Sequence, residues 1–352
     1  MHLRTLGRTG LQVAELCLGT MHFGWKTDER MSAAILDTFR EAGGNFIQAA
    51  SSAGVDGGFD RLATALSEEH VGRWMAEREV PRSSLVLATR LVLRDRGPVG
   101  SSLASVIRER CEASLRRLRT DHLDLFMLEW SPALLPLDET LEALAPLVWK
   151  GMVTAVGASG FPAWRLMEAR GRSTTRSIPG FDVAQHDHSL VMRRPFEPEL
   201  EDFCRETRTG FLARSPLAGG FLVGEAPGRR TWIHPGRAAW MRNRYLHCGS
   251  TSVRDVLEAV ALRRGASVAQ TALAWVLSRE NVTAAVVGVT SPPQLRELIG
   301  ATRAPLLEGD LSALVAIPPR AVSTGQQFDS WLRNDPTSNR ASPEEWTVGA
   351  HN

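Results

Sequence analysis

The sequence predicts an α/β protein folded as a single closed (β/α)8 barrel. The chain has 352 residues, of which 43% are hydrophobic and 23% charged, so its composition is globular and it is long enough to bury a large core. Eight short apolar runs alternate with longer segments whose apolar residues recur at helical spacing. Regular β–α alternation is typical of parallel strands joined by helices, and eight strands favour a closed barrel over an open sheet.

The predicted elements follow one another in order. Residues 3–13, "LRTLGRTGLQV", predict an opening hairpin with Gly10 at its turn. Helical periodicity is clear in "SLASVIRERCEASLRRL" 102–118 and "SVAQTALAWVLSR" 267–279. The eight predicted strands are "ELCLGT" 15–20, "NFIQAA" 45–50, "LVLATRL" 85–91, "LDLFMLEW" 123–130, "TAVGAS" 154–159, "FDVAQHDH" 181–188, "GFLARSP" 210–216 and "TAAVVGV" 283–289.

Two segments do not fit the repeat. Residues 224–252, after the seventh strand, form a long insertion rich in Arg, Trp and Gly, and its aromatic residues favour a lid over a disordered loop. We therefore predict one barrel domain over residues 1–321. The polar tail, residues 322–352, carries Phe328, Trp331 and Trp346, which suggest that it packs on or near the barrel.

The composition argues against several classes of function. A net charge of +2 provides no strong field for nucleic acid or a membrane surface, so we expect neither as a partner. The four cysteines are far apart and form no CxxC pair, which favours free thiols in a reducing cytoplasm and predicts no metal site. The N-terminus has no apolar leader, and no apolar run approaches the roughly 18 residues of a membrane span. A soluble cytoplasmic protein is expected.

Four motifs resemble those of the aldo-keto reductases in order and spacing: "LGRTGLQVAELCLGTMHFG" 6–24, "DHLDLFMLEW" 121–130, "VGASGF" 156–161 and "RSPLAGGFLVG" 214–224. The resemblance covers roughly residues 3–302 and is strongest to the bacterial and potassium-channel β-subunit-like branch. It implies the same barrel, with an active site at the C-terminal ends of the strands.

The resemblance also implies a catalytic site whose four family residues are all replaced. The family reduces carbonyls with NADPH through an Asp, a Tyr that protonates the carbonyl oxygen, a Lys and a His. In "NFIQAASSAG" 45–54, Gln48 and Ala53 stand at the Asp and Tyr positions. Arg90 of "LATR" replaces the Lys, and Glu129 of "DLFMLE" replaces the His. Ala53 has no proton to transfer, and a guanidinium keeps its proton at neutral pH, so the family's carbonyl protonation is lost.

The resemblance implies a weakened site for NADP(H). Leu298 stands where the family has an adenine-contacting Asn, Thr290 replaces the usual Arg, and Arg214 replaces the aromatic residue that stacks on the nicotinamide. The family's 2′-phosphate preference is therefore not expected, unless Arg296 supplies it. The positions that correspond to the cofactor site are Ser159, Gln185, Ser215, Leu217, Gly219, Thr290 and Gln294.

Three titratable residues are candidates for moving protons at the barrel mouth. Glu129 is a general acid or base if burial raises its pKa, or the ion-pair partner of Arg90. His186 and His188 of "QHDHS" lie two apart on one strand face, which suits a proton relay or half of a metal site, but the family resemblance favours a pocket-lining position for His188. His22 follows the first barrel strand, at the pocket or on the surface. The predicted substrate pocket comprises Met21, Ala53 and Trp130.

These residues predict an enzyme that has abandoned the family's hydride chemistry. The reaction is expected to be an elimination, cyclisation or isomerisation of a small secondary metabolite, in which Glu129 with His22 or His188 moves protons while Arg90 and Gln48 hold an oxyanion. One alternative is a catalytically silent, NADP(H)-binding regulatory or scaffold subunit. Another is an NADPH-dependent oxidoreductase with a different proton donor. The sequence does not identify the substrate or the oligomeric state, because folds host many chemistries.

Overall fold

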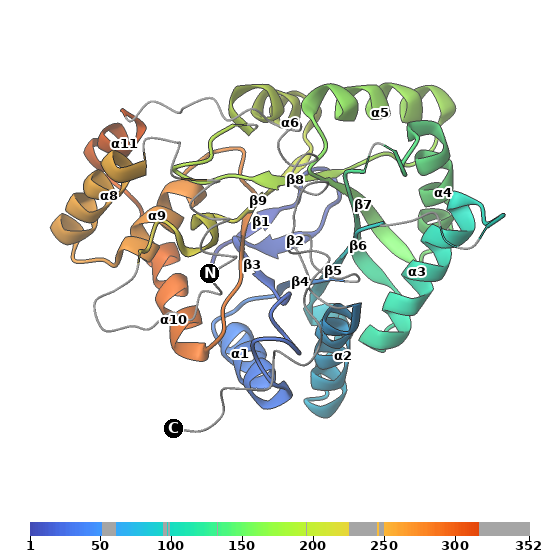
Figure 1. Ribbon diagram of the computed structural model, residues 1–352, viewed down its shortest axis with the longest axis horizontal. Coiled ribbons are helices and arrows are strands. Elements are labelled where there is room, and N and C mark those ends of the chain that lie inside the picture. The colour runs from blue at the N-terminus through green and yellow to red at the C-terminus, as the bar shows by residue number, and fades with distance from the viewer. Residues whose placement is uncertain are drawn as a thin grey trace, which may run out of the picture.

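The barrel is closed by eight parallel strands in the order in which they occur in the sequence. The computed structural model describes residues 1–50, 61–93, 97, 99–131, 133–194, 196–224, 245 and 250–316. Strand β3 pairs with β4 and so on to β9, and β10 pairs with both β9 and β3 to complete the ring (Figure 1). The predicted (β/α)8 barrel is confirmed.

Each barrel strand coincides with a predicted apolar run. Strand β6 is buried along its whole length, as expected where helices cover one face of a sheet and the barrel interior covers the other. The strands are β3 Leu16–Gly19, β4 Phe46–Ala50, β5 Val86–Leu91, β6 Leu123–Glu129, β7 Val153–Ser159, β8 Val183–Asp187, β9 Gly210–Arg214 and β10 Ala284–Val287.

The predicted hairpin is present and closes the N-terminal end of the barrel. Strands β1 Leu3–Thr5 and β2 Gln12–Ala14 pair antiparallel, and Gly10 in their turn has a φ of +78°. Leu6 and Val13 are fully buried and pack with Phe46 and other inward residues of the barrel strands. This apolar plug leaves the opposite end, where the strands finish, as the open mouth.

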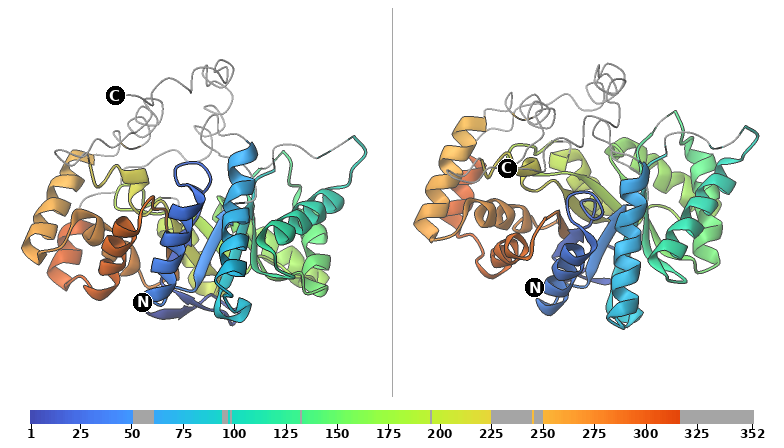
Figure 2. Two further views of the ribbon diagram at one scale, coloured as in Figure 1. Left: turned by 90° about the horizontal axis from the view of Figure 1, so that it is seen from below. Right: turned by 60° about the horizontal axis from the view of Figure 1, so that its bottom comes forward.

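Ten α-helices are described around the barrel, and Figure 2 shows α1 and α2 side by side along its outer wall. Their starts follow capping rules: the Ser102 hydroxyl accepts from the Ser105 amide at the start of α3, and Ser267 and Gln270 form a capping box at α9. The helices are α1 Glu29–Glu41, α2 Arg61–Glu77, α3 Leu103–Leu118, α4 Leu137–Trp149, α5 Ala163–Arg176, α6 Glu201–Thr207, α8 Ser250–Arg264, α9 Val268–Leu277, α10 Pro292–Gly300 and α11 Glu308–Val315.

Several predictions fall outside the described residues. They concern Ala53, nearly all of the insertion at 224–252, Cys248 and the tail at 322–352. Cys17, Cys111 and Cys204 are buried free thiols, as expected. Within the described ranges, no helix is long and apolar enough to cross a membrane. The same ranges contain no group of three or more His, Cys, Asp or Glu side chains placed to hold a metal ion.

Candidate active site

Six consecutive strands deliver polar side chains to the barrel mouth. The strand register places Glu129 beside Ser159, Ser159 beside Gln185, and Asp187 beside Arg214. Because side chains alternate between the two faces of a strand, residues two apart, such as Gln185 and Asp187, share the inner face. We call this group the mouth network; it comprises Gln48, Arg90, Glu129, Ser159, Gln185, Asp187 and Arg214.

Glu129 is held between two guanidinium groups. Arg90 Nη1 donates to its Oε2 at 2.6 Å, and Arg214 Nη1 lies 3.0 Å from Oε1 and 3.3 Å from Oε2. The residue is only 8% exposed. Burial on its own raises the pKa of a carboxyl group, but here the charges of Arg214 and Arg90 outweigh it and lower the Glu129 pKa to about 2. Glu129 is therefore a carboxylate at neutral pH and has no proton to donate.

Arg214 links the two carboxylates of the network. Its Nε donates to Asp187 Oδ1 at 2.8 Å, while its Nη1 reaches Glu129 and lies 3.4 Å from the Ser159 hydroxyl. Burial lowers the pKa of an arginine, but the charges of Asp187 and Glu129 dominate and raise the pKa of Arg214. The result is a row of alternating charges, Arg90, Glu129, Arg214 and Asp187, with no net charge.

A chain of neutral side chains runs from Ser159 at the level of Glu129 to Gln48 and Met127 deeper in the barrel. The Ser159 hydroxyl donates to Gln185 Oε1 at 3.2 Å, Gln185 Nε2 donates to Gln48 Oε1 at 3.0 Å, and Gln48 Nε2 approaches Met127 Sδ at 3.2 Å. Gln48 and Met127 each lie two residues before the last residue of their strands. The amides thus have partners within the protein and support the charged layer above them.

The structure does not place His188 with the mouth network, which corrects the prediction that it lines the pocket. His188 follows Asp187, so its side chain points to the opposite side of the sheet, where it is fully buried. Its ring packs against Phe196 and Trp275, with centroids 4.7 and 5.3 Å away. Burial, followed by the charges of Arg279 and Arg193, lowers its pKa to about 3, so it is neutral near pH 7.

His22 and Met21 lie on another part of the mouth rim. His22 packs beside Trp25, with ring centroids 5.6 Å apart, and next to Gly288 at the end of β10. The strand before it, β3, is three positions around the barrel from β6, which carries Glu129. Direct proton transfer between His22 and Glu129 is therefore not supported by the arrangement.

Trp130, directly after Glu129, packs on Phe161, with ring centroids 4.6 Å apart.

The family's cofactor positions outside the mouth network divide into two groups. Thr290 donates through its amide and hydroxyl to Gln294 Oε1 at 2.9 and 3.0 Å, at the start of α10. Ser215 and Leu217 accept backbone hydrogen bonds in the tight turn after β9, where Gly219 has a φ of +66°. Both groups follow adjacent strands and so lie near each other at the mouth.

These residues do not fit a nicotinamide ring as they stand. Ser159 and Gln185 bond to each other, and the guanidinium of Arg214 approaches Ser159. Pro292 and Pro293 begin α10 and have no N–H groups to offer a phosphate.

Asp187 is the site residue that sequence reasoning missed, together with the role of Arg214 as a clamp on Glu129. A signal was available: Gln185 and Asp187 share one strand face, and Arg214 ends the next strand. The family motifs point to the family's own catalytic and cofactor positions, whereas Asp187 gains its partner from a neighbouring strand.

The fold and site together define a (β/α)8 barrel protein with a charged mouth. The sequence pattern of the Aldo/keto reductase family matches residues 15–318, and the chain belongs to that family. Its members generally bind NADP(H).

Three relatives illustrate the range of the family near this chain. The Bacillus subtilis protein "Uncharacterized oxidoreductase YrpG" is 36% identical over 312 residues, covering 86% of this chain and 91% of the relative. A "Probable voltage-gated potassium channel subunit beta" from Oryza sativa is 29% identical, covering 84% and 90%. "Norsolorinic acid reductase B" from Dothistroma septosporum is 28% identical, covering 91% and 82%.

Proposed function

We propose that the protein is a non-redox enzyme that isomerises, cyclises or eliminates from a small secondary metabolite carrying an anionic group. The observation that supports this proposal is the position of Glu129, ionised and held between Arg90 and Arg214. Two guanidinium groups can bind a carboxylate or an oxyanion, and a buried carboxylate can accept a proton. None of these three side chains can protonate a carbonyl at neutral pH, which is the step that carbonyl reduction requires.

The substrate would switch Glu129 from an ion-pair partner to a base. An anionic group can accept hydrogen bonds from Arg90 or Arg214 in place of Glu129. It then offsets the positive charges that keep the Glu129 pKa low, while the burial of Glu129 remains and raises its pKa. Glu129 then becomes a stronger base once the substrate is bound. This coupling reconciles the low pKa of the free protein with a role in proton transfer.

A proton shift needs no co-reactant at this site. Glu129 removes a proton from a carbon next to a carbonyl, and the electron pair of the broken C–H bond moves onto the carbonyl oxygen. The resulting enolate is held by a guanidinium of Arg90 or Arg214. In a substrate with a conjugated C=C bond, return of the same proton to the far end of that bond completes an isomerisation and restores the carboxylate. In an elimination the enolate expels a leaving group from the β-carbon, and the leaving group takes the proton from Glu129, which again restores the carboxylate.

A silent binding subunit is the second candidate, because the described members of the mouth network bond to one another. A saturated network of this kind is also what a purely structural role requires. Two relatives are named as probable voltage-gated potassium channel β-subunits. Under this reading the protein would turn over no small molecule.

A reductase with another proton donor is the third candidate, and the names of the Bacillus and Dothistroma relatives favour it. It predicts NADPH-dependent reduction of an ordinary aldehyde such as 4-nitrobenzaldehyde. Our proposal predicts no NADPH oxidation above a protein-free control, since loss of a general acid costs about 10²–10⁴ in rate.

The deciding experiment follows proton exchange without any nicotinamide. Small keto acids are incubated with the protein in D2O, and loss of the signal of the protons next to the carbonyl is followed by NMR. We expect exchange above background, and a decrease of about 10²-fold or more in Glu129→Gln. Glu109→Gln, which changes an exposed carboxylate on α3, is the matched control. Equal exchange in both variants would refute the role of Glu129, and no exchange with any acid would favour the silent subunit.

A further inference from the structure

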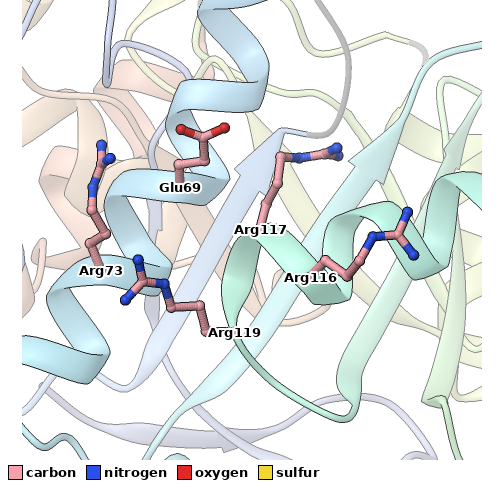
Figure 3. Close-up of a pocket in the computed structure, with 5 residues that line it drawn as sticks. All are labelled: Glu69, Arg73, Arg116, Arg117 and Arg119. Atoms are coloured by element: carbon pink, nitrogen blue, oxygen red, sulfur yellow. The ribbon is translucent and has the colours of Figure 1, made fainter.

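A second anion site is suggested by a hollow on the outer wall, between α2 and the end of α3. It has a volume of about 260 Å³ and is lined by Glu69, Arg73, Arg116, Arg117 and Arg119. We call it the arginine hollow. Figure 3 shows these five side chains, with the guanidinium of Arg119 extending from the end of α3 toward α2 and Arg73.

Close packing of two helices creates the hollow. At Gly72 of α2, an added Cβ would lie 2.2 Å from the carbonyl oxygen of Arg117 in the last turn of α3. Only a glycine allows this approach. Arg73, the next residue along α2, is thereby brought to the end of α3, where the Arg119 amide donates to the Arg116 carbonyl at 3.3 Å. The arginines are thus gathered by backbone packing.

The arginines differ in how far their charges are compensated. Arg117 donates through Nε to the fully buried Glu68 at 2.6 Å, which anchors it. Arg73 pairs with Glu29 at 2.5 Å on the surface. Among the described residues, neither Arg116 nor Arg119 has an ion-pair partner.

The helix dipole of α3 explains only part of this arrangement. Cations in the last turn of a helix interact favourably with its dipole, which accounts for Arg116 and Arg117 in α3. It does not account for Arg73, which belongs to a different helix and faces the same hollow. Glu69 is the one acidic residue of the lining, so cationic groups dominate the surface that a ligand would meet.

We propose that the arginine hollow binds the phosphate group of a compact phosphorylated ligand. Guanidinium groups present a planar fork of donors that suits phosphate oxygens, and four arginines line this hollow. The hollow is smaller than the roughly 300–1,000 Å³ typical of drug-sized sites, so pyrophosphate or the phosphate end of a small metabolite fits better than a large ligand. This site is independent of the proposed reaction at the barrel mouth.

The test is calorimetric titration with inorganic phosphate, pyrophosphate and glucose 6-phosphate at low ionic strength, where screening is weak. The key variant is the double change Arg116→Gln and Arg119→Gln, because both side chains are exposed and the fold should be kept. The control is Arg110→Gln, which removes an equally exposed charge from α3 outside the hollow. Arg117 is left intact because it neutralises the buried Glu68.

We expect at least one of the three compounds to bind in a one-to-one ratio, with affinity falling about tenfold or more in the double variant and remaining near wild type in Arg110→Gln. Tighter binding of pyrophosphate would indicate a polyphosphate ligand, and comparable binding of the sugar phosphate would indicate a monoester. Absence of binding would overturn the proposal. So would equal weakening in both variants, which indicates a general charge effect, or full binding in the double variant, which places the site elsewhere.

Discussion

Replacing Glu129 by Gln should destabilise the protein substantially near neutral pH. The change keeps the size of the side chain but removes the charge that Arg90 and Arg214 share. Breaking a buried ion pair by removing one partner costs about 3–5 kcal/mol. The pKa leads to a similar figure, since lowering it from 4.5 to about 2 corresponds to about 3 kcal/mol of stability.

The difference in stability between wild type and Glu129→Gln should also depend on pH. Because the folded-state pKa of Glu129 lies below its unfolded value, its contribution is fully present above about pH 4.5 and is lost as the pH falls toward 2. The gap in stability between wild type and Glu129→Gln should therefore narrow on acidification through that window. At neutral pH the gap should be at its full size.

The assay is urea unfolding followed by circular dichroism at several pH values between 7 and 3. Glu109→Gln, an exposed carboxylate on α3, should stay within about 0.5 kcal/mol of wild type at neutral pH. If Glu129→Gln were equally close to wild type at pH 7, the ion-pair reasoning would be refuted, and with it the explanation of the low pKa.

Three further outcomes follow from other parts of the molecule. Calorimetry should show weak nicotinamide-cofactor binding with little preference for NADPH over NADH, because Thr290 replaces a charged contact worth about 1.5–3 kcal/mol and Leu298 a neutral one worth about 0.5–1.5 kcal/mol. A submicromolar NADPH dissociation constant would contradict this. Gly72→Ala should lower stability by about 1–3 kcal/mol in thermal melts, because the added Cβ would lie 2.2 Å from a backbone oxygen of α3. The control Gly171→Ala, which has open space around it in α5, should be neutral or stabilising by up to about 1 kcal/mol. Equal effects of the two changes would refute the close packing of α2 on α3. His188→Phe should keep the fold and lessen the loss of stability below about pH 6.5, because His188 stays neutral to about pH 3 in the folded protein while the unfolded imidazole takes up a proton. Urea titrations that show the same loss of unfolding free energy at acid pH in both proteins would count against this.

The barrel was predictable from sequence because its signals are local and repeated. Each strand is a short apolar run, and the helices between them carry their own periodicity and caps, as in the capping box of Ser267 and Gln270. The opening hairpin was marked by Gly10, whose positive φ needs a glycine. These features depend on neighbours along the chain, so one sequence is enough to find them.

The site was predictable only in part, because its chemistry depends on which strands meet. The pairing of Arg90 with Glu129 follows from adjacent strands and was foreseen as one of two alternatives. Arg214 reaches Glu129 from a strand three positions away, and that contact sets the pKa. His188 was misplaced because a one-residue step along a strand reverses the side of the sheet that a side chain faces.

The most direct test of this account is a ¹³C NMR titration of the Glu129 side-chain carboxyl, assigned by comparison with Glu129→Gln. In the free protein the signal should not titrate between about pH 8 and 4, since the Glu129 pKa is about 2. With a bound keto acid that exchanges its protons, the pKa should rise, because the anion competes for Arg90 and Arg214. A titration midpoint above 4.5 in the free protein, or an unchanged pKa when the keto acid is bound, would contradict the mechanism.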